Sequence, residues 1–125
     1  MRMKLSMEQP GGIHLVRGYS AAGVRVDDQL HERSVIVSAA SVVAGWRPQR
    51  VEDLTADDLQ VALDLAPEIL LLGTGPTQRF PEPPLYEALY RARTGFEIMD
   101  TGAACRTYNV LVGEGRAVVA ALLVG

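Results

Sequence analysis

The residues best suited to chemistry lie in a glycine-rich turn, Gly73–Thr74–Gly75, that directly follows an apolar segment. Such a turn can present backbone N–H groups to an anion, and the nearby Arg79 guanidinium favours phosphate or carboxylate. The alternative interpretation is that the glycines only allow a tight turn. A P-loop would need a Gly-Lys-Ser/Thr ending, and a dinucleotide-binding turn would need a third glycine where Gln78 stands. The turn is therefore a candidate anion site, but it is neither a P-loop nor a dinucleotide-binding turn.

A second group of polar residues opens a segment of helical character further along the chain. Asp100 and Thr101 can cap the start of this helix, with Thr101 as the expected N-cap residue. Because helix N-termini attract anions, this end can share a ligand with the glycine turn if the two meet in the fold. In an enzyme, Asp100 or Tyr108 would carry protons, and the catalytic residues are otherwise unknown. The candidate ligand-binding residues are Gly73, Thr74, Gly75, Arg79, Asp100, Thr101, Arg106 and Tyr108.

The single cysteine, Cys105, has two interpretations. It could act as a nucleophile if His14 or His31 approached it in the fold. Its position on the apolar side of a helix favours a small buried hydrophobic residue instead. One cysteine excludes an intramolecular disulfide, and the histidines lack ligand-like spacing, so we expect neither a metal site nor a cofactor.

Three other sets of residues, Asn109, Glu114 with Arg116, and Trp46, also lead to structural expectations. Asn109 lies inside a helical segment, where asparagine is unfavourable, so we expect it to tie the helix to a loop rather than to contact substrate. Glu114 and Arg116 flank a tight turn and are expected to form a local ion pair. For Trp46, a place in the core and a role as an exposed anchor both remain open.

The elements that must position these residues follow from the apolar pattern. Residues 69–72 form an unbroken apolar run, which predicts a strand buried on both faces with the glycine turn at its carboxyl end. Ligands of open α/β sheets usually bind at that end. Before this strand, Thr55 is expected to cap a helix, with Asp57 and Asp58 at the positive end of its dipole, and Pro67 is expected to end it. The stripe of this helix that faces the core is predicted to comprise Leu59, Ala62, Leu63 and Ala66.

The remaining segments complete an α/β pattern. Strands are predicted near residues 13–19, 24–27, 34–39, 96–99 and 116–124, the last one central in its sheet. A second helix is predicted to turn Leu85, Ala88, Leu89 and Ala92 inward, and a third to span residues 103–111. This order predicts an α/β fold, a three-layer sandwich with a mixed central sheet, a β-rich N-terminal part and three helices. Residues 1–12 are predicted to be a disordered lead and residues 13–125 a single domain.

Composition narrows the function classes. The chain has 125 residues, a net charge of −3 and no Lys after Lys4, which argues against nucleic-acid binding. Its longest apolar run, residues 117–124, is far shorter than the roughly 20 residues of a membrane-spanning helix. The first residues lack the apolar region of a secretory signal. We therefore expect a cytoplasmic protein without a transmembrane segment.

Three blocks of sequence carry a resemblance to a known family. They are residues 67–75 (PEILLLGTG), residues 100–111 (DTGAACRTYNVL), and residues 114–116 (EGR) with the apolar run that follows. With Trp46, they resemble the Mth938-like family of small uncharacterised proteins, which includes bacterial single-domain members and a mitochondrial assembly factor for respiratory complex I. The resemblance spans residues 13–124 and implies a three-layer α/β fold.

Two classes of function follow. The resemblance implies a non-catalytic accessory or assembly factor that contacts a protein partner, as a monomer or a homodimer. The alternative is a small-molecule anion-binding protein or enzyme that uses the Gly73–Gly75 turn and Arg79. We favour the first class because no complete catalytic constellation is present in the sequence.

Overall fold

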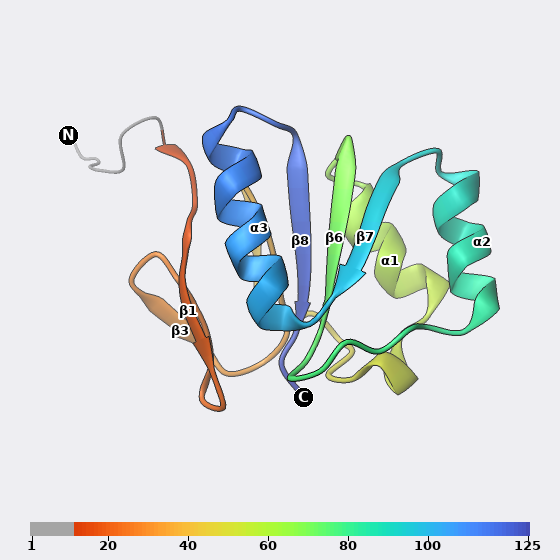
Figure 1. Cartoon of the computed structure of the whole chain (residues 1–125), viewed down its shortest axis with the longest axis horizontal. Helices are drawn as coiled ribbons and strands as arrows, with labels where there is room; N and C mark the ends of the chain where they lie inside the picture. Colours follow the sequence, from red (N-terminus) through yellow and green to blue (C-terminus); the bar gives the residue numbers. More distant parts are fainter. Residues whose placement is uncertain (1–11) are drawn as a thin grey trace.

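The computed structural model describes residues 12–125, whose helices and strands are shown in chain order in Figure 1. The elements are β1 (Val16–Ser20), β2 (Gly23–Val26), β3 (Gln29–His31), β4 (Val35–Ser38), β5 (Val42–Val43), the 3-10 helix η2 (Val51–Asp53), α1 (Ala56–Leu63), β6 (Ile69–Thr74), α2 (Pro83–Arg91), β7 (Gly95–Met99), α3 (Thr101–Gly113) and β8 (Val118–Leu123). The predicted disordered lead, residues 1–12, lies outside the described residues except for Gly12. It therefore stays a prediction.

Five strands form one mixed sheet in the order β5-β4-β8-β6-β7. β6 runs parallel to both β8 and β7, while β4 pairs antiparallel with β8 and with β5. The last strand in the chain thus lies in the middle of the sheet, as its nearly continuous apolar sequence predicted. The carboxyl ends of β6, β7 and β8 meet at one edge of the sheet, at the bottom of Figure 1.

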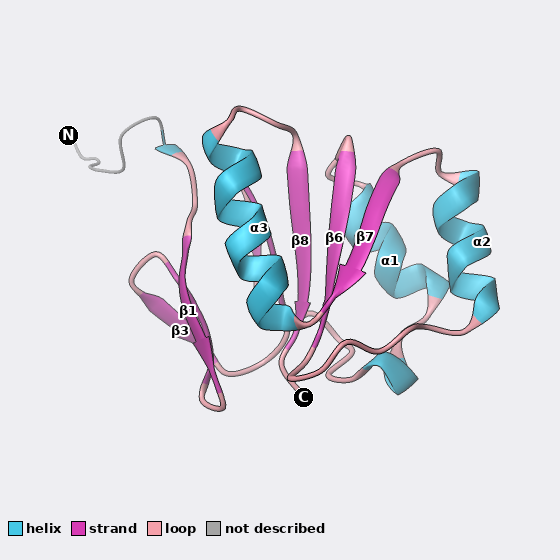
Figure 2. Cartoon of the chain, in the orientation of Figure 1, coloured by secondary structure: helices cyan, strands magenta, loops and turns pink. Residues whose placement is uncertain are grey.

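Each face of this sheet is covered by a separate hydrophobic core. Leu71 of β6 packs in the core beneath α3, together with Tyr108. Leu70 and Leu72 pack in the other core, beneath α1 and α2, together with Leu59. Residues 69–72 are therefore a strand buried on both faces, as predicted. Figure 2 shows the strands between α3 on one side and α1 and α2 on the other, which confirms the three-layer α/β fold.

A second sheet, β1-β2-β3, is antiparallel and packs against α3. The register of β1 with β2 shifts between Val16 and Gly18, so that Arg17 occupies a β-bulge. The sequence predicted the hairpin of β1 and β2 but not β3. Gln29–His31 is too short to show a strand pattern, and it is held as a strand by its pairing with β2.

Helix α1 begins as predicted but ends earlier. The Thr55 hydroxyl accepts a hydrogen bond from the Asp58 N–H, and the Asp58 carboxylate accepts one from the Thr55 N–H, which makes a capping box. The helix ends at Leu63, so the predicted place of Ala66 on its inner stripe is wrong. Ala66 has a φ of 57° because the chain turns sharply there, and the following Pro67 disfavours helical backbone at Ala66.

Candidate functional site

The glycine turn and the start of α3 meet at the carboxyl edge of the sheet, where they are joined by Thr101. The Thr101 N–H donates to the Gly75 carbonyl at 2.8 Å, and the Gly75 N–H donates to the Thr101 hydroxyl at 2.8 Å. That hydroxyl in turn donates to the Leu123 carbonyl of β8 at 2.6 Å. Thr101 is fully buried. The glycine turn and the start of α3 are thus adjacent, as a shared ligand site requires. The Thr101 side chain, rather than a ligand, joins them.

Close packing explains the glycine at the end of β6. A Cβ atom on Gly73 would lie 2.9 Å from the Thr101 Cα and 3.0 Å from its hydroxyl oxygen, so α3 can approach β6 only because residue 73 has no side chain. Gly75 has a φ of 96°, and a Cβ there would lie 2.7 Å from the Gly125 carbonyl. Both glycines therefore have a structural reason to be present, apart from any ligand.

The other parts of the predicted anion site also have partners within the protein. The Thr74 hydroxyl donates to the Thr77 carbonyl at 2.6 Å and accepts from the Arg79 N–H at 3.0 Å. The Arg79 guanidinium forms an ion pair with Glu52 of η2, and both side chains are about half exposed. An anion at the turn would have to displace Thr101 from the Gly75 N–H and Glu52 from Arg79. The geometry gives this site little support, and it stays a prediction.

The N-cap of α3 differs from the prediction. Asp100, with extended backbone, is the N-cap, and its carboxylate accepts from the Ala103 N–H at 2.8 Å. Thr101 is the first helical residue, because its hydroxyl is already used between Gly75 and β8. The helix also continues to Gly113, two residues beyond the predicted end.

Tyr108 and Asn109 attach α3 to the small sheet. The Tyr108 ring is fully buried, and its hydroxyl donates to the His14 carbonyl at 2.7 Å. Burial, helped by the charge of Asp27, raises the pKa of Tyr108 above its ordinary value, which does not suit a proton carrier. Asn109 accepts from the Val16 N–H at 2.9 Å and donates to the Val16 carbonyl at 2.7 Å. The prediction that Asn109 ties the helix to a neighbouring segment is confirmed, although that segment is a strand.

Cys105 is buried in the core beneath α3. Burial raises the pKa of its thiol to about 12, although the charge of Arg106 acts in the opposite direction. His14 forms a 2.7 Å contact with Asp27 through its Nδ1 atom. The interpretation of Cys105 as a small buried hydrophobic residue is therefore confirmed, and nothing here activates it as a nucleophile.

We expect Cys105 to react very slowly with a disulfide reagent such as Ellman's reagent in the native protein. Because burial raises the pKa of the thiol to about 12, almost none of it is ionised at pH 8, and burial blocks access as well. The reaction should reach the rate of a free thiol once the protein is unfolded in guanidinium chloride. A Cys105→Ser variant controls for side reactions, and complete modification of the native protein within minutes would contradict the expectation.

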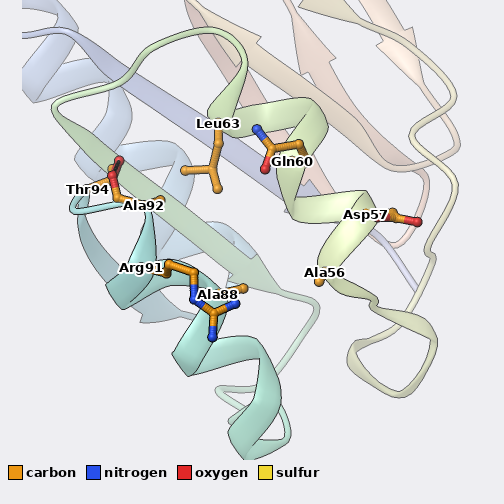
Figure 3. Close-up of a pocket in the computed structure, with 8 residues that line it drawn as sticks. All are labelled: Ala56, Asp57, Gln60, Leu63, Ala88, Arg91, Ala92 and Thr94. Carbon is orange, nitrogen blue, oxygen red and sulfur yellow. Dashed lines mark hydrogen bonds between the residues drawn. The ribbon is translucent and has the colours of Figure 1, made fainter.

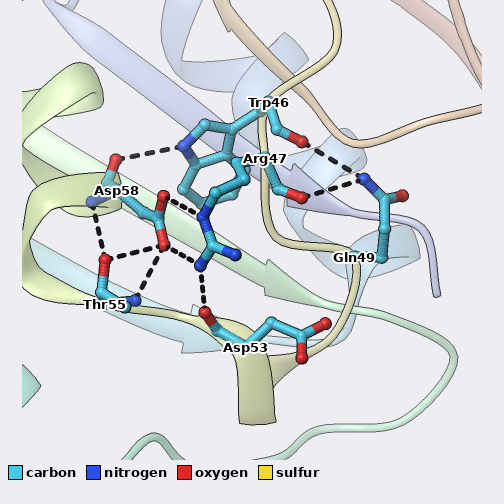
Figure 4. Close-up of polar contacts among 6 residues, drawn as sticks. All are labelled: Trp46, Arg47, Gln49, Asp53, Thr55 and Asp58. Atoms are coloured by element: carbon cyan, nitrogen blue, oxygen red, sulfur yellow. Dashed lines mark hydrogen bonds and ion pairs between the residues drawn. The ribbon is translucent and has the colours of Figure 1, made fainter.

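A cluster around Asp58, drawn in Figure 4, was not anticipated as a unit. The buried carboxylate accepts from Arg47 Nε at 3.0 Å and Nη2 at 2.6 Å, and from the Thr55 hydroxyl at 2.9 Å. The Trp46 indole N–H donates to the Asp58 carbonyl at 3.1 Å, and Trp46 is only 3% exposed. Trp46 is therefore a core residue. Arg47 also donates to the carbonyl of Asp53, so the cluster joins the segment after β5, η2 and α1.

Hydrogen bonds from Arg47 and Thr55 hold the pKa of Asp58 below its ordinary value, against the opposing effect of burial. The sequence signal for this cluster was the pattern Thr-x-x-Asp before an apolar run, which marks a capping box. The pattern does not reveal that Arg47, eleven residues earlier, binds the same carboxylate.

The predicted ion pair between Glu114 and Arg116 is wrong. Arg116 pairs with Glu68 at 3.0 Å, and Glu68 also accepts from the Ala117 N–H at 3.1 Å. The reason is that β6 and β8 begin side by side, which brings Glu68 next to the start of β8. The contact closes the end of the sheet opposite the glycine turn.

Two hollows lie away from the glycine turn. One, of about 530 Å³, separates α1 from α2 and is drawn in Figure 3. It is lined mainly by short side chains such as Ala56, Ala88 and Ala92, and its Arg91 is paired with Glu87. The other, of about 320 Å³, lies between β1 and α3 and includes Arg106. Of the predicted residues, Arg106 and Asp100 thus both lie beside Gly102 at this hollow, whereas the Arg79 guanidinium is paired with Glu52 of η2.

Two further findings concern residues 12–125. None of their helices has the length and apolar character needed to cross a bilayer. Within the same residues, no group of three or more His, Cys, Asp or Glu side chains is arranged so that it could hold a metal ion.

Comparisons with known proteins agree with this fold. The chain is 32% identical over 117 residues to NADH dehydrogenase (ubiquinone) 1 alpha subcomplex assembly factor 3 of Drosophila melanogaster, which covers 87% of this chain but 58% of that protein. The Bos taurus protein of the same name is 30% identical over 121 residues, covering 95% of this chain and 65% of that protein. The chain thus spans less than two thirds of either relative.

A crystal structure from Bordetella parapertussis matches with a TM-score of 0.85 and 39% identity, covering 94% of this chain and 100% of that one. A solution structure from Bordetella pertussis, described as a Mth938-like domain, matches with a TM-score of 0.79 and 33% identity, covering 97% of this chain and 92% of that one. Residues 16–123 match the family described as Protein of unknown function (DUF498/DUF598). The chain therefore belongs to this family.

Proposed function

We propose that the protein is a non-catalytic accessory factor that assists the assembly of a respiratory NADH dehydrogenase through protein–protein contacts. The observation that carries the proposal is the similarity to relatives named as assembly factors, which extends over 87% of this chain for the Drosophila protein. Because this chain spans only 58% of that relative, the role of the whole relative is carried over as a proposal. In this proposal the protein acts in the cytoplasm, as a monomer or a homodimer.

The use of polar side chains inside the fold supports a non-catalytic role. The Thr101 hydroxyl and the Tyr108 hydroxyl bind backbone carbonyls, and Asn109 binds the backbone of β1. The raised pKa of Cys105 leaves its thiol protonated. The Thr101, Tyr108 and Asn109 side chains are therefore used to hold α3 in place rather than for chemistry.

An aromatic cluster on α2 and β7 is suited to contact a partner. Tyr86 and Tyr90 of α2 lie with ring centroids 6.0 and 5.4 Å from that of Phe96 on β7. Tyr90 is 69% exposed, and β7 forms an edge of the main sheet. Exposed aromatic side chains at an edge strand are typical of surfaces that bind another protein. We therefore propose that a subunit of the NADH dehydrogenase binds at this cluster.

The assembly role predicts a defect in cells that lack the protein. Deleting its gene in the native host should reduce the amount of fully assembled NADH dehydrogenase on native gels, together with NADH oxidation by isolated membranes. Expression of the wild-type chain should restore both. Normal amounts of the assembled enzyme in the deletion strain would contradict the proposal.

The position of the partner can be tested by photo-crosslinking in the same cells. A photoreactive phenylalanine analogue in place of Tyr90 should crosslink to a subunit of the NADH dehydrogenase. The matched control carries the analogue in place of Val110, which is 59% exposed but lies on α3, across the sheet from α2. Equal crosslinking from both positions would contradict the proposal that the partner binds at the aromatic cluster. The assembly role itself would still be tested by the deletion experiment.

A further inference from the structure

The hollow between β1 and α3 brings together two arginines that come from different elements. It has a volume of about 320 Å³, and its lining includes Arg17 of β1 and Arg106 of α3. Both side chains are exposed, and neither forms an ion pair among residues 12–125. Two guanidinium groups at one hollow, without carboxylate partners in the described part of the chain, favour an anionic ligand.

Arg17 is held over α3 by the backbone around it. Both polar backbone groups of Val16 are hydrogen-bonded to Asn109, at 2.9 and 2.7 Å, so the residue before Arg17 is attached to the helix. Arg17 itself occupies the bulge of β1. Because a bulge removes one residue from the regular ladder, it can redirect that side chain, and bulges are frequent next to binding sites.

Two glycines line the same hollow, and one of them lies beside Arg106. Gly18 and Gly102 both line the hollow. A Cβ on Gly102 would lie 3.3 Å from Asp100 Oδ1, 3.4 Å from Arg106 Nη1 and 3.6 Å from Cδ2 of Tyr19, so a larger residue would crowd these three side chains. Gly102 lies in the first turn of α3, whose N–H groups have no partners within the helix.

The environment of the remaining polar groups is compatible with an anion. Burial, followed by the charges of Cys105 and Asp100, raises the pKa of Tyr19, so its hydroxyl stays protonated and can donate a hydrogen bond. The Asp100 carboxylate lies beside Gly102, and its Oδ1 atom accepts a hydrogen bond from the Ala103 N–H at 2.8 Å. The donors at the hollow thus include two guanidinium groups and a phenol.

We infer that the hollow between β1 and α3 binds a small phosphate monoester, with Arg17 and Arg106 on its oxygens and Tyr19 against its organic part. A planar guanidinium matches the oxygens of a phosphate, and the volume lies at the lower end of the range for small-molecule sites, roughly 300–1,000 Å³. This site is separate from the glycine turn and from the aromatic cluster of α2 and β7. It does not depend on the assembly role.

The test is a titration of ¹⁵N-labelled full-length protein with phenyl phosphate at constant ionic strength, followed by NMR. Saturable shifts are expected at the amide signals of Gly18 and Gly102. The double variant Arg17→Gln/Arg106→Gln should weaken binding about tenfold or more, because it removes charge-assisted hydrogen bonds from an otherwise unchanged fold. The matched control is Arg79→Gln, which removes an exposed arginine that does not line this hollow and should bind like the wild type.

Three outcomes would overturn the inference. Shifts that stay linear with phenyl phosphate concentration would show that no site is present. Shifts centred on Gly73 and Gly75 and lost in Arg79→Gln would place the anion at the glycine turn instead. Equal affinity for inorganic phosphate and phenyl phosphate would remove the assignment to a monoester. Thermal unfolding of all variants shows whether the fold is intact, and it should match the wild type because the replaced side chains are exposed.

Discussion

Replacing Thr101 by valine is expected to lower the free energy of unfolding by about 2–4 kcal/mol, because each buried polar group left without a partner costs about 1–3 kcal/mol. Valine has nearly the same shape as threonine but cannot donate to the Leu123 carbonyl or accept from the Gly75 N–H. Both groups lie where the start of α3 meets the ends of β6 and β8. Urea unfolding followed by the fluorescence of the buried Trp46 measures the change.

Thr107→Val is the matched control for this experiment. Thr107 lies on the same helix, is partly exposed, and has no side-chain hydrogen bond among residues 12–125. Its replacement should change the stability by less than about 0.5 kcal/mol, as is usual for such surface sites. If Thr101→Val were as stable as Thr107→Val, the junction would contribute nothing to the fold.

Asp58→Asn should destabilise the protein by about 2–3 kcal/mol at neutral pH. The buried carboxylate accepts hydrogen bonds from Arg47 and Thr55, and an amide in its place would turn an N–H₂ group toward these donors. The Arg47 side chain is 60% exposed, so most of the effect is assigned to the hydrogen bonds and the lost capping box rather than to the ion pair. Urea unfolding at pH 7 measures the difference.

The effect of Asp58→Asn should also depend on pH. The pKa of Asp58 is lower in the folded protein than in the unfolded chain, so the carboxylate binds a proton more readily after unfolding. Its stabilising contribution is therefore complete above the unfolded pKa of about 4 and is lost as the pH falls through the folded pKa. The difference between wild type and Asp58→Asn should shrink accordingly between pH 7 and pH 3.

Asp57→Asn provides the control for the pH series. Asp57 is the preceding residue of α1 and is exposed, so its replacement should have a small effect, about 0.5 kcal/mol, through the helix dipole alone. A difference between wild type and Asp58→Asn that stays constant between pH 7 and pH 3 would contradict the role assigned to the carboxylate.

The local features of the fold could be predicted because their causes are local. The apolar run of residues 69–72 is long enough to specify a doubly buried strand, and Thr55 is followed by the acidic residues of a helix start. β3 could not be predicted, since three residues become a strand only when a neighbouring strand is available to pair with them. The early end of α1 depends on the turn into β6, which the helical pattern alone does not show.

The contacts of the candidate site are harder to predict from the sequence, because they join residues that lie far apart in it. The sequence left open whether Thr101 and Gly75 meet; they do, but the Thr101 hydroxyl donates to the carbonyl of Leu123, 22 residues later. Arg79 was assigned to an anion, whereas its guanidinium pairs with Glu52, 27 residues earlier. The sequence does not single out Arg17, because the bulge that positions it depends on how β1 pairs with β2.

The place of β8 in the sheet affects how this chain folds as it is synthesised. β8 lies between β4 and β6, yet it follows both of them in the sequence. While the chain leaves the ribosome from its amino end, β4 and β6 have no common neighbour, and both faces of the sheet remain incomplete. We expect the nascent chain to bind chaperones until residues 118–123 have emerged, and translation that stops before them to leave a product without a stable fold.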